Sequence, residues 1–380
     1  MRFLLLDFDY PAFLDWLYAE NPALHEKPYD EQLRVITEVC FGQVGFWTSN
    51  LRALGHEAYD IHVNNEFMQK QWAREHGLKV SSDWRWEFRL RRGIVPWASR
   101  VHRPRRWFDE ILAAQIRHYK PDVLLNLWMP GISKRFLHEM KPDVRLLMGQ
   151  HASMPLADSE DFSCYDLAIS SFPPTVEYFR QKGIPAELNR LGFEPSILTR
   201  LGSGTKTFDL TYVGSFGSSH KIHNNRGSWL ETLCSRFHQM KVWGPEQDFN
   251  ELSPSSPIRK CYVGPAWGLE MYKILSRSRI TLNHHGNIAP YANNRRLYEA
   301  TGVGAFLITD AKKDLHEMFN PGKEVVAYRT PEECVELVQY YLEHEDEGQA
   351  IARAGQERTI KEHTCYERTR ELLDIVRKYQ

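Results

Sequence analysis

The feature that most constrains the fold of this chain is a regular alternation between short apolar runs and segments long enough to form helices. The clearest instance is a near-repeat. KPDVLLNL at residues 120–127 and KPDVRLLM at residues 141–148 each follow a helix-length segment and open an apolar run. YDLAISS at residues 165–171 continues the series. Strands that alternate with helices pair in parallel and are covered by helices on both faces. The sequence therefore predicts an α/β fold built on parallel sheets.

Two such series occur, separated by a segment of different composition. A chain of 380 residues exceeds one ordinary hydrophobic core, so two domains are expected. GFEPSILTRLGSGTKTF, residues 192–208, interrupts the alternation and is typical of a linker. Strands of a second series are predicted at residues 208–217, 240–244, 278–286, 304–310 and 324–328. A helical pattern follows, in which Gly355 is predicted to divide two helices. These features place a first domain at residues 1–195, a linker at 196–207, a second domain at 208–355 and a closing helix at 356–380.

Composition and charge exclude several classes of protein. The net charge of -1 gives no global bias towards nucleic acid, so no nucleic-acid partner is expected. The apolar run at the N-terminus is interrupted by Asp7, which predicts a first strand, and no later segment is long enough to span a membrane. The six cysteines form no C-x-x-C pair, which indicates a reducing compartment and no thiolate metal site. We therefore expect a globular, cytoplasmic protein.

The stretch NNRRLYEATGVGAFLITD, residues 293–310, places two arginines just before a glutamate. If Asn293 or Asn294 caps a helix, then Arg295, Arg296 and Glu299 share one helix face. The preceding strand delivers its loop to the start of this helix, where free N–H groups favour a phosphate. Arginine binds phosphate in bidentate fashion, and a carboxylate accepts two ribose hydroxyls. The alternative is a solvated ion pair that only stabilises the helix.

A second loop of the same kind opens the second domain. YVGSFGSSHKIHNNR, residues 212–226, leads from a buried strand into a Gly/Ser turn followed by basic residues. Its candidate anion-binding residues are Gly214, Ser215, Gly217, His220, Lys221 and Arg226. Backbone N–H groups in such a turn come close to an anion, although the loop is neither G-x-G-x-x-G nor a P-loop. An exposed turn without a ligand is the alternative.

The residues from Leu282 to the C-terminus resemble the CgeB-like, glycosyltransferase group 1 domain of GT-B glycosyltransferases. NNRRLYEATGVGAFLITD, DLHEMFNPGKEVVAYRTPEEC and GQERTIKEHTCYERTRELL carry the resemblance. It covers most of residues 208–380, and extends more weakly to GQHASM and YDLAISSFPPTVEYFRQKGIPAELNRLGFEP in the first half. The resemblance implies two Rossmann-like domains that face each other across a cleft, with a last helix that crosses back to the first domain.

By this resemblance the second domain binds a nucleotide-sugar donor. Glu299 then holds the ribose, and Arg296, with His220 or Arg226, holds the diphosphate. Many retaining enzymes of the family carry a second glutamate eight residues before the first, and this chain has Tyr291 there. Tyr291 and the HHGN segment, His284 to Asn287, are the expected substitutes at the transferred sugar.

Glycosyl transfer requires stabilisation of the departing diphosphate, and an inverting reaction also requires a base. Cations can stabilise the diphosphate without a metal, so no metal or other cofactor is expected. His151, in RLLMGQHASMP, follows a predicted strand directly and is the candidate base, because a pKa near 6.5 suits neutral pH. The alternative is a histidine that only bonds a loop, and Asp158 and Asp161 are nearby competitors.

Two segments are candidates for binding the acceptor. FGQVGFW holds Gly42 and Gly45, which form either a loop that faces the cleft or a weak point in a helix. DWRWEFRLRRGIVPWASRVHRPRRWF, residues 83–108, interleaves arginine with tryptophan, and its candidates are Trp84, Trp86, Arg91 and Trp97, with Trp107 nearby. This pattern suits an anionic glycan or a polyprenyl-phosphate-linked acceptor. A membrane surface, single-stranded nucleic acid and an insertion that packs on its own domain are the alternatives.

Together these features predict a metal-independent glycosyltransferase. The donor binds the second domain, a glycan, lipid-linked or protein acceptor binds the first, and transfer follows domain closure. A nucleotide-sugar epimerase or hydrolase on the same scaffold is one alternative, because a fold does not determine a reaction. A non-catalytic, glycan-binding envelope or spore-coat protein is another. Peripheral membrane contact is compatible with the arginine- and tryptophan-rich segment.

Overall fold

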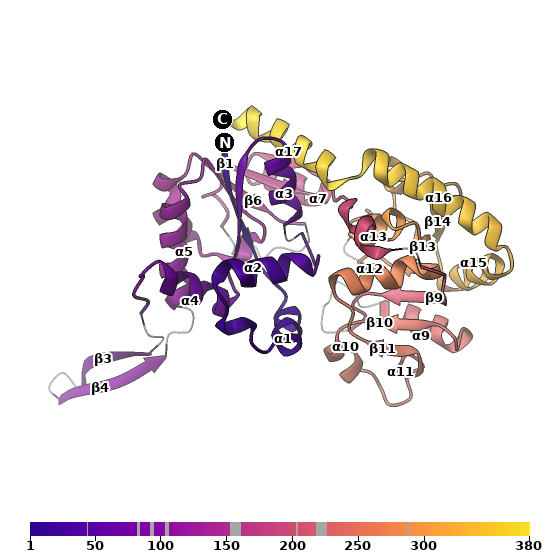
Figure 1. Ribbon diagram of the computed structural model, residues 1–380, viewed down its shortest axis with the longest axis horizontal. Helices are drawn as coiled ribbons and strands as arrows, with labels where there is room; N and C mark the ends of the chain where they lie inside the picture. The colour runs from indigo at the N-terminus through magenta and orange to yellow at the C-terminus, as the bar shows by residue number, and fades with distance from the viewer. Residues whose placement is uncertain are drawn as a thin grey trace.

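The computed structural model describes residues 1–43, 45–81, 84–91, 95–102, 106–152, 161–202, 204–217, 226–286 and 289–380, and side chains are described outside residues 84–106. The chain forms two lobes that lie side by side, each built on a parallel sheet of six strands (Figure 1). The N-lobe holds β1, β2 and β5 to β8, and the C-lobe holds β9 to β14. None of the described helices is long and apolar enough to span a membrane.

The N-lobe sheet has the strand order β2-β1-β5-β6-β7-β8. Its strands are β1 Arg2–Asp7, β2 Glu57–His62, β5 Val123–Asn126, β6 Leu146–Gln150, β7 Leu167–Ser170 and β8 Ala186–Leu188. Its helices are α1 Pro11–Glu20, α2 Tyr29–Glu38, α3 Phe46–Ala53, α4 Glu66–Glu75, α5 Arg106–Tyr119, α6 Lys134–Met140 and α7 Pro173–Gln181, with short turns η1 Leu24–Glu26, η2 Met129–Gly131 and η3 Lys141–Asp143. The predicted strands of the near-repeat are therefore β5 and β6.

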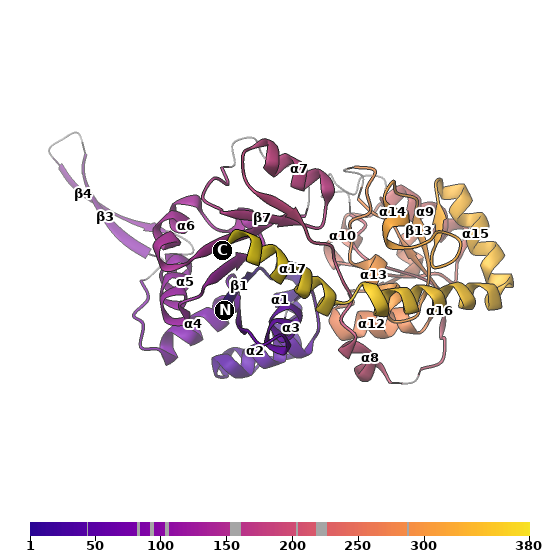
Figure 2. The same cartoon turned by 90° about the horizontal axis from the view of Figure 1, so that it is seen from above.

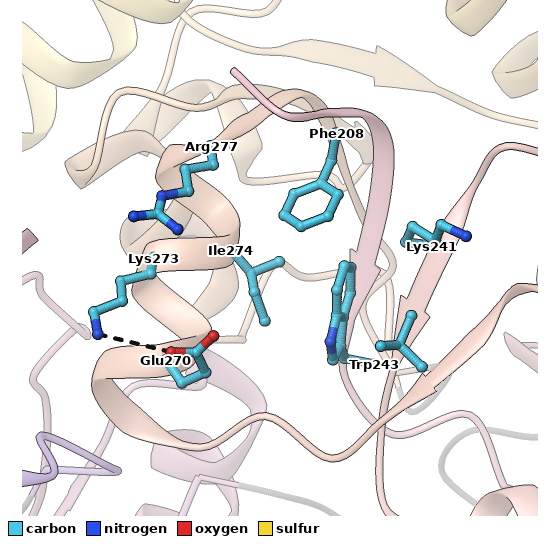
Figure 3. A pocket seen from close by; sticks show the side chains of 8 residues that line it. Phe208, Lys241, Trp243, Glu270, Lys273, Ile274 and Arg277 are labelled. Atoms are coloured by element: carbon cyan, nitrogen blue, oxygen red, sulfur yellow. Dashed lines mark ion pairs between the residues drawn. The ribbon is translucent and has the colours of Figure 1, made fainter. Parts of the chain in front are cut away.

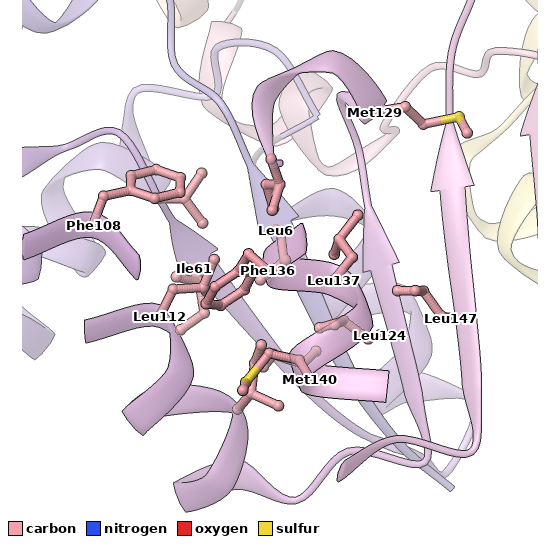
Figure 4. Packing of buried hydrophobic residues seen from close by; sticks show 14 of the residues in the cluster. Leu6, Ile61, Phe108, Leu112, Leu124, Met129, Phe136, Leu137, Met140 and Leu147 are labelled. Carbon is pink, nitrogen blue, oxygen red and sulfur yellow. The ribbon is translucent and has the colours of Figure 1, made fainter. Parts of the chain in front are cut away.

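The continuous apolar run of β1 is explained by two cores, one on each face of the sheet. Leu4 and Leu6 belong to a cluster with residues of α4, α5 and α6, and Figure 4 shows Leu6 facing the side chains of these helices. Phe3 and Leu5 point to the opposite face and pack with residues of α3 and of the last helix. All four side chains are fully buried. A strand covered on both faces requires apolar residues at every position, which is what this sequence supplies.

The C-lobe sheet has the order β11-β10-β9-β12-β13-β14. Its strands are β9 Phe208–Val213, β10 Lys241–Trp243, β11 Tyr262–Gly264, β12 Ser278–Asn283, β13 Phe306–Asp310 and β14 Val326–Tyr328. Its helices are α8 Ser196–Leu201, α9 Arg226–Arg236, α10 Glu246–Asn250, α11 Ile258–Cys261, α12 Gly268–Ser276, α13 Arg296–Gly302, α14 Leu315–Met318 and α15 Pro331–Glu343. All five predicted strands are present, and β11 was not predicted. The segment predicted as a linker contains α8.

The last two helices run along one side of both lobes (Figure 1). α16 Glu345–Glu362 packs on the C-lobe, and α17 Cys365–Tyr379 packs on α3 of the N-lobe. Gly355 lies inside α16, so the prediction that it divides two helices is wrong. The break lies at residues 363–364, where backbone bonds of 2.8 Å join Phe193 N to His363 O and Cys365 N to Phe193 O. The two chain segments that pass between the lobes are therefore bonded to each other.

The arginine- and tryptophan-rich segment forms an antiparallel hairpin of β3 Trp84–Arg91 and β4 Val95–His102. This hairpin projects from the N-lobe on the side away from the C-lobe, as both views show (Figures 1 and 2). Trp107, from the same stretch of sequence, begins the buried face of α5 and is 5% exposed. Packing on its own domain, one of the predicted alternatives, is thus correct for Trp107.

Candidate functional site

The carboxyl ends of β9 and β12 are neighbours in the C-lobe sheet. The order in which the chain adds strands reverses between these two strands, and ligands of such sheets bind in the crevice outside the carboxyl ends at this point. The loop after β9 begins at Gly214, and the loop after β12 begins at His284. Both loops carry residues predicted to bind the donor, so the fold brings the two predicted segments together.

α13 is the helix that carries the predicted ribose and phosphate residues. It begins at Arg296, and the side-chain oxygen of Asn294 accepts a hydrogen bond from the N–H of Leu297 at 3.3 Å. Asn294 also exchanges hydrogen bonds of 2.7 and 3.2 Å with Asn283, the last residue of β12. Arg295 stands directly before the helix and makes no side-chain capping bond, so the predicted asparagine bond to the start of α13 comes from Asn294, one residue earlier. Asn294 attaches the start of α13 to the end of β12.

Arg296 and Glu299 form an ion pair inside the C-lobe. Nη1 of Arg296 lies 2.8 Å from Oε2 of Glu299, and the two side chains are only 14% and 9% exposed. Arg296 Nε also donates to the carbonyl of Val213, the last residue of β9, at 3.1 Å. The hydroxyl of Tyr272 on α12 donates to Glu299 at 3.5 Å. The alternative of a solvated pair does not hold, because the pair is buried and bonded to β9 and α12.

Arg295 does not share this face of α13. It lines a small cavity with Gln43, Trp47 and Arg368, which belong to the N-lobe side. Its Nε is buried without a hydrogen-bond partner among the described residues. The expected common face of the two arginines is therefore corrected: tertiary contacts direct Arg296 to the sheet and Arg295 to the junction between the lobes.

Arg226, the first residue of α9, connects the two loops of the site. Its Nη1 donates to the carbonyl of Ser215 at 2.8 Å, and its Nη2 donates to the carbonyl of His284 at 2.7 Å. The carboxylate of Asp248 on α10 accepts bonds of 2.7 Å from the Ser215 hydroxyl and from Phe216 N. Arg226 is 7% exposed. It therefore holds the loops in place, and its charge lies beneath the site that they form.

A polar cluster joins the ends of β12 and β13: His285 belongs to the predicted HHGN segment, whereas its partners Asp310 and Lys312 were not predicted. Nδ1 of His285 lies 2.6 Å from Oδ1 of Asp310, and the His285 N–H donates to the same oxygen at 2.8 Å. Lys312 Nζ lies 3.0 Å from Oδ2 of Asp310. Burial opposes ionisation of Asp310, but His285, Lys312 and His284 outweigh it and hold the pKa of Asp310 far below its usual value. The available signal in the sequence was that Asp310 ends a predicted strand.

His284, predicted at the transferred sugar, lies between these groups. Its side chain is 12% exposed, and its ring packs edge-on against Trp229 at 5.1 Å between centroids. Burial lowers the pKa of His284, with the Asp310 carboxylate acting in the opposite direction. A lowered pKa makes the imidazole neutral at pH 7. His284 therefore supplies a hydrogen-bonding ring without a positive charge.

Asn293 joins the donor segment to the N-lobe. Its amide donates to the carbonyl of Ala152 at 2.5 Å, and its side-chain oxygen accepts from the hydroxyl of Ser171 at 2.7 Å. Ala152 follows β6 and Ser171 follows β7, so the carboxyl ends of these strands face the donor segment. The predicted base His151 is the neighbour of Ala152. It is 7% exposed, and its backbone N–H donates to the carbonyl of Ile169 at 3.2 Å.

Tyr291 lies in the same junction. Its ring is edge-on to Phe172 of the N-lobe at 6.3 Å, and Lys313 Nζ lies 5.7 Å from its centroid. An aromatic ring and a lysine therefore occupy the place where the family resemblance implies a glutamate. Asp161, the competitor of His151, forms an exposed ion pair with Lys134. His220, Lys221, Asn287 and Asp158 lie outside the described residues.

Gly42 and Gly45 lie in the loop between α2 and α3, with φ angles of 71° and 72° that favour glycine. The helical alternative is therefore wrong. This loop contacts the C-lobe through a 2.7 Å bond from Leu269 N to Val39 O. Gly45 also lines an N-lobe pocket of about 470 Å³ with Asp60 and residues of α2 and α3. The predicted acceptor loop thus lies at the contact between the lobes.

Trp84, Trp86, Arg91 and Trp97 are not near the donor residues. They belong to β3 and β4, and the hairpin extends away from the C-lobe (Figure 2). The sequence showed that arginine and tryptophan alternate in this segment. It did not show that the hairpin lies far from the junction of the lobes. If they bind an acceptor, they bind a part of it that is remote from the group that receives the sugar.

The expectation of a metal-free site overlooks one pattern. Asp7-Phe8-Asp9 is a D-x-D triplet, a spacing with which carboxylates hold metals. In the structure Asp9 Oδ2 lies 2.9 Å from His62 Nδ1, and both side chains are buried. Among the described residues, no group of three or more His, Cys, Asp or Glu side chains is arranged to hold a metal ion. The triplet is part of a buried ion pair at the end of β1.

Comparisons with known proteins identify the fold and the type of the second domain. Residues 226–374 match a family model described as glycosyl transferase-like, and this range includes Arg226, His284, Arg296 and Glu299. No curated protein matches the chain in sequence. A glycosyltransferase from Rickettsia africae is similar in structure, with a TM-score of 0.61 and 11% identity over 100% of this chain and 98% of that one.

Two further solved structures are similar over the whole chain. HepE from Anabaena, in complex with UDP-glucose, has a TM-score of 0.58 and 11% identity, and the match covers 100% of both chains. Sucrose-phosphate synthase from Thermosynechococcus elongatus has a TM-score of 0.57 and 12% identity, over 100% of this chain and 99% of that one. The fold is GT-B. The matched domain within this fold indicates a glycosyltransferase, whereas identities this low carry no information on the substrate.

Proposed function

We propose that the protein transfers a sugar from a nucleoside diphosphate sugar, bound by the C-lobe, to a glycan, lipid-linked or protein acceptor, bound by the N-lobe, without a metal ion. The observation that carries this proposal is the buried Arg296–Glu299 pair at the carboxyl ends of β9 and β12, where a doubly wound sheet binds its ligand. The family resemblance adds the CgeB-like group as the subgroup to which we assign the chain.

The two side chains of this pair bind different parts of the donor. Arg296 uses Nε for Val213 and Nη1 for Glu299. Among the described residues Nη2 has no such partner, which leaves its N–H groups for a phosphate oxygen. A carboxylate accepts about four hydrogen bonds, so Glu299 retains acceptor capacity for ribose hydroxyls beside Arg296 and Tyr272. The positive charge of Arg296 also stabilises the diphosphate as it departs.

His151 is the residue that we propose to act on the acceptor. The hydrogen bonds that Asn293 donates to Ala152 and accepts from Ser171 hold Ala152, the neighbour of His151, against the donor segment. A general base must lie within reach of the acceptor hydroxyl, and its pKa must be near the working pH. We place the reaction in the cytoplasm, since the six cysteines are free thiols.

The deciding experiment is a calorimetric titration with UDP, GDP, ADP, CDP and dTDP in the presence of EDTA. UDP comes first, because the solved relatives include complexes with UDP-glucose and with UDP and GlcNAc. We expect one diphosphate to bind wild-type protein, and the variants Glu299→Gln and Arg296→Gln to bind it about 10- to 100-fold more weakly, because a buried charged group loses its partner. Glu139→Gln, which alters an exposed ion pair with Arg135, is the matched control. Unchanged affinity in both site variants would remove the assignment.

Incubation with the matching nucleotide sugar then separates the alternatives. A transferase releases the diphosphate faster when an acceptor is added. An epimerised sugar as the main product would favour the epimerase, and release that no acceptor accelerates would favour the hydrolase. A loss of turnover in EDTA that Mg²⁺ restores would contradict a metal-independent reaction.

A further inference from the structure

A second pocket lies on the C-lobe, and none of the donor residues lines it. This α12 pocket has a volume of about 360 Å³ and lies between α12 and the strands β9, β10 and β11 (Figure 3). Its base is apolar: the rings of Phe208 and Trp243 meet edge to face at 5.2 Å, and Ile274 of α12 lies opposite them. Val263 of β11 is 53% exposed at its rim. The volume is within the range of small-molecule sites.

The rim of the α12 pocket is mainly positive. Lys241 stands on β10, Lys273 stands in the last turn of α12, and Arg277 directly follows that helix, as Figure 3 shows. Among the described lining residues, Glu270 is the only acid, and it lies 3.8 Å from Lys273. Three basic side chains against one acid attract an anion, and an aromatic floor favours a ligand with a flat, apolar body.

We propose that the α12 pocket is an effector site for a small organic anion with a ring-shaped apolar body. The basis for an effector role is α12 itself, which contacts three parts of the molecule. Its pocket side presents Lys273 and Arg277. Its other side contacts the donor pair, through Met271 Sδ at 2.9 Å from Arg296 and through the hydroxyl of Tyr272 at 3.5 Å from Glu299.

The first turn of α12 also contacts the N-lobe, through the bond of 2.7 Å from Leu269 N to Val39 O. A small shift of α12 therefore changes the support of the donor pair and the contact between the lobes together. A ligand in the α12 pocket changes the affinity for the donor if it binds one position of this helix more tightly than another. The size of the change is set by the difference between these two affinities. The effect is reciprocal, so the donor changes the affinity of the effector by the same factor.

The first test uses anilinonaphthalene sulfonate (ANS), a fluorescent anion with an apolar ring system, as the probe. We expect ANS to bind the folded wild-type protein, with energy transfer from tryptophan that is reduced in Trp243→Phe. Arg277→Glu and Lys241→Glu should each weaken binding about tenfold, as expected for the loss of one charged contact. Lys361→Glu, on an exposed surface of α16, is the control. The neutral probe phenylnaphthylamine should bind more weakly than ANS.

Equal ANS affinity in wild type and in both charge variants would overturn the proposal, as would equal binding of the neutral probe. This test does not depend on the proposed function, because it needs no nucleotide. The second test measures the affinity for the preferred nucleoside diphosphate with and without saturating ANS. We expect a change in wild type that is absent in Arg277→Glu. No change in wild type, with ANS bound, would reject the effector role.

Discussion

The charges buried at the end of β1 make the stability of the N-lobe dependent on pH. Burial lowers the pKa of His62, but Asp9, Asp7 and Asp60 outweigh it and raise this pKa from 6.5 to about 9. Burial, with Asp9, raises the pKa of Asp7 from 3.8 to about 6. Both groups therefore hold a proton in the folded state that they lose in the unfolded state. It follows that rising pH destabilises the folded state, through Asp7 between pH 4 and 6 and through His62 between pH 6.5 and 9.

We predict that the free energy of unfolding of the wild type falls by about 3 kcal/mol between pH 6.5 and 9 through His62, from a shift of this size in a fully buried group. His62→Gln should flatten this dependence, and His138→Gln, at an exposed position, should leave it unchanged. Urea unfolding at both pH values measures the difference, and NMR titration of the His62 imidazole measures its pKa directly. A His62 that titrates below pH 7 would contradict the prediction.

Helical spacing predicted the Arg296–Glu299 pair but not which arginine would form it. Spacings of three and four residues both bring side chains together on a helix. Val213 and Met271 select Arg296, and these contacts come from other elements of the lobe. The pairing of His285 with Asp310 could not be predicted from the sequence either. It depends on the register in which Asn283 of β12 lies beside Thr309 of β13, and no local pattern encodes that register.

The strand β1 was predicted, and all five predicted strands of the C-lobe are present. A run of three residues is too short to show a period, so strands of this length are predicted unevenly: β10 and β14 were predicted, and β8 and β11 were not. The two KPDV segments predict strands that begin at equivalent positions. In the structure Lys141–Asp143 forms the short turn η3, and β6 begins only at Leu146. Local sequence similarity therefore located the two strands without fixing where they begin.

Gly355 is required by the packing of α16, and not by the end of a helix, as the sequence predicted. A Cβ atom at this position would lie 2.3 Å from the carbonyl oxygen of Glu324, so α16 needs glycine for close packing on the C-lobe. At Gly348, in the same helix, the nearest atom would be a ring carbon of Phe306 at 3.3 Å. The glycine thus permits a close approach in the middle of a helix, and it does not end the helix.

We predict that Gly355→Ala destabilises the protein by about 1–3 kcal/mol, although alanine favours helix, because a backbone atom must move. Gly348→Ala should lie within about 1 kcal/mol of wild type, since the gain in helix propensity offsets a small displacement of a side chain. Chemical denaturation of both variants gives the comparison. Equal stability of the two would mean that α16 and the segment before β14 separate without cost.

The relative position of the lobes depends on a few contacts that only the folded molecule reveals. The sequence predicted two lobes, the place of the donor and, as one of two alternatives, a glycine loop facing the cleft, but it did not indicate that Val39 and Phe41 would lie against the start of α12. That contact requires Gly268, whose φ is 50° and whose Cβ would lie only 1.9 Å from Val39 O. Gly322 also has a positive φ, of 83°, but nothing lies within 4 Å of its Cβ position.

We predict that Gly268→Ala separates the lobes at this contact, whereas Gly322→Ala costs only the strain of its backbone, about 1 kcal/mol. Small-angle X-ray scattering should show a larger radius of gyration for Gly268→Ala and an unchanged one for Gly322→Ala. Hydrogen exchange at the Leu269 amide should rise in the first variant alone. An unchanged radius and an unchanged exchange rate in Gly268→Ala would show that other contacts hold the lobes together.

The position of α17 has a consequence for the synthesis of this protein. Leu372, Leu373, Ile375 and Val376 complete the core that contains Phe3 and Leu5. A ribosome therefore releases β1 before the C-lobe and α17 after it. While the C-lobe emerges and folds, this face of β1 has only the cover that Trp47 and Leu51 of α3 give it, and exposed apolar surface is what chaperones bind. The N-lobe therefore cannot complete this core before the whole C-lobe has been translated.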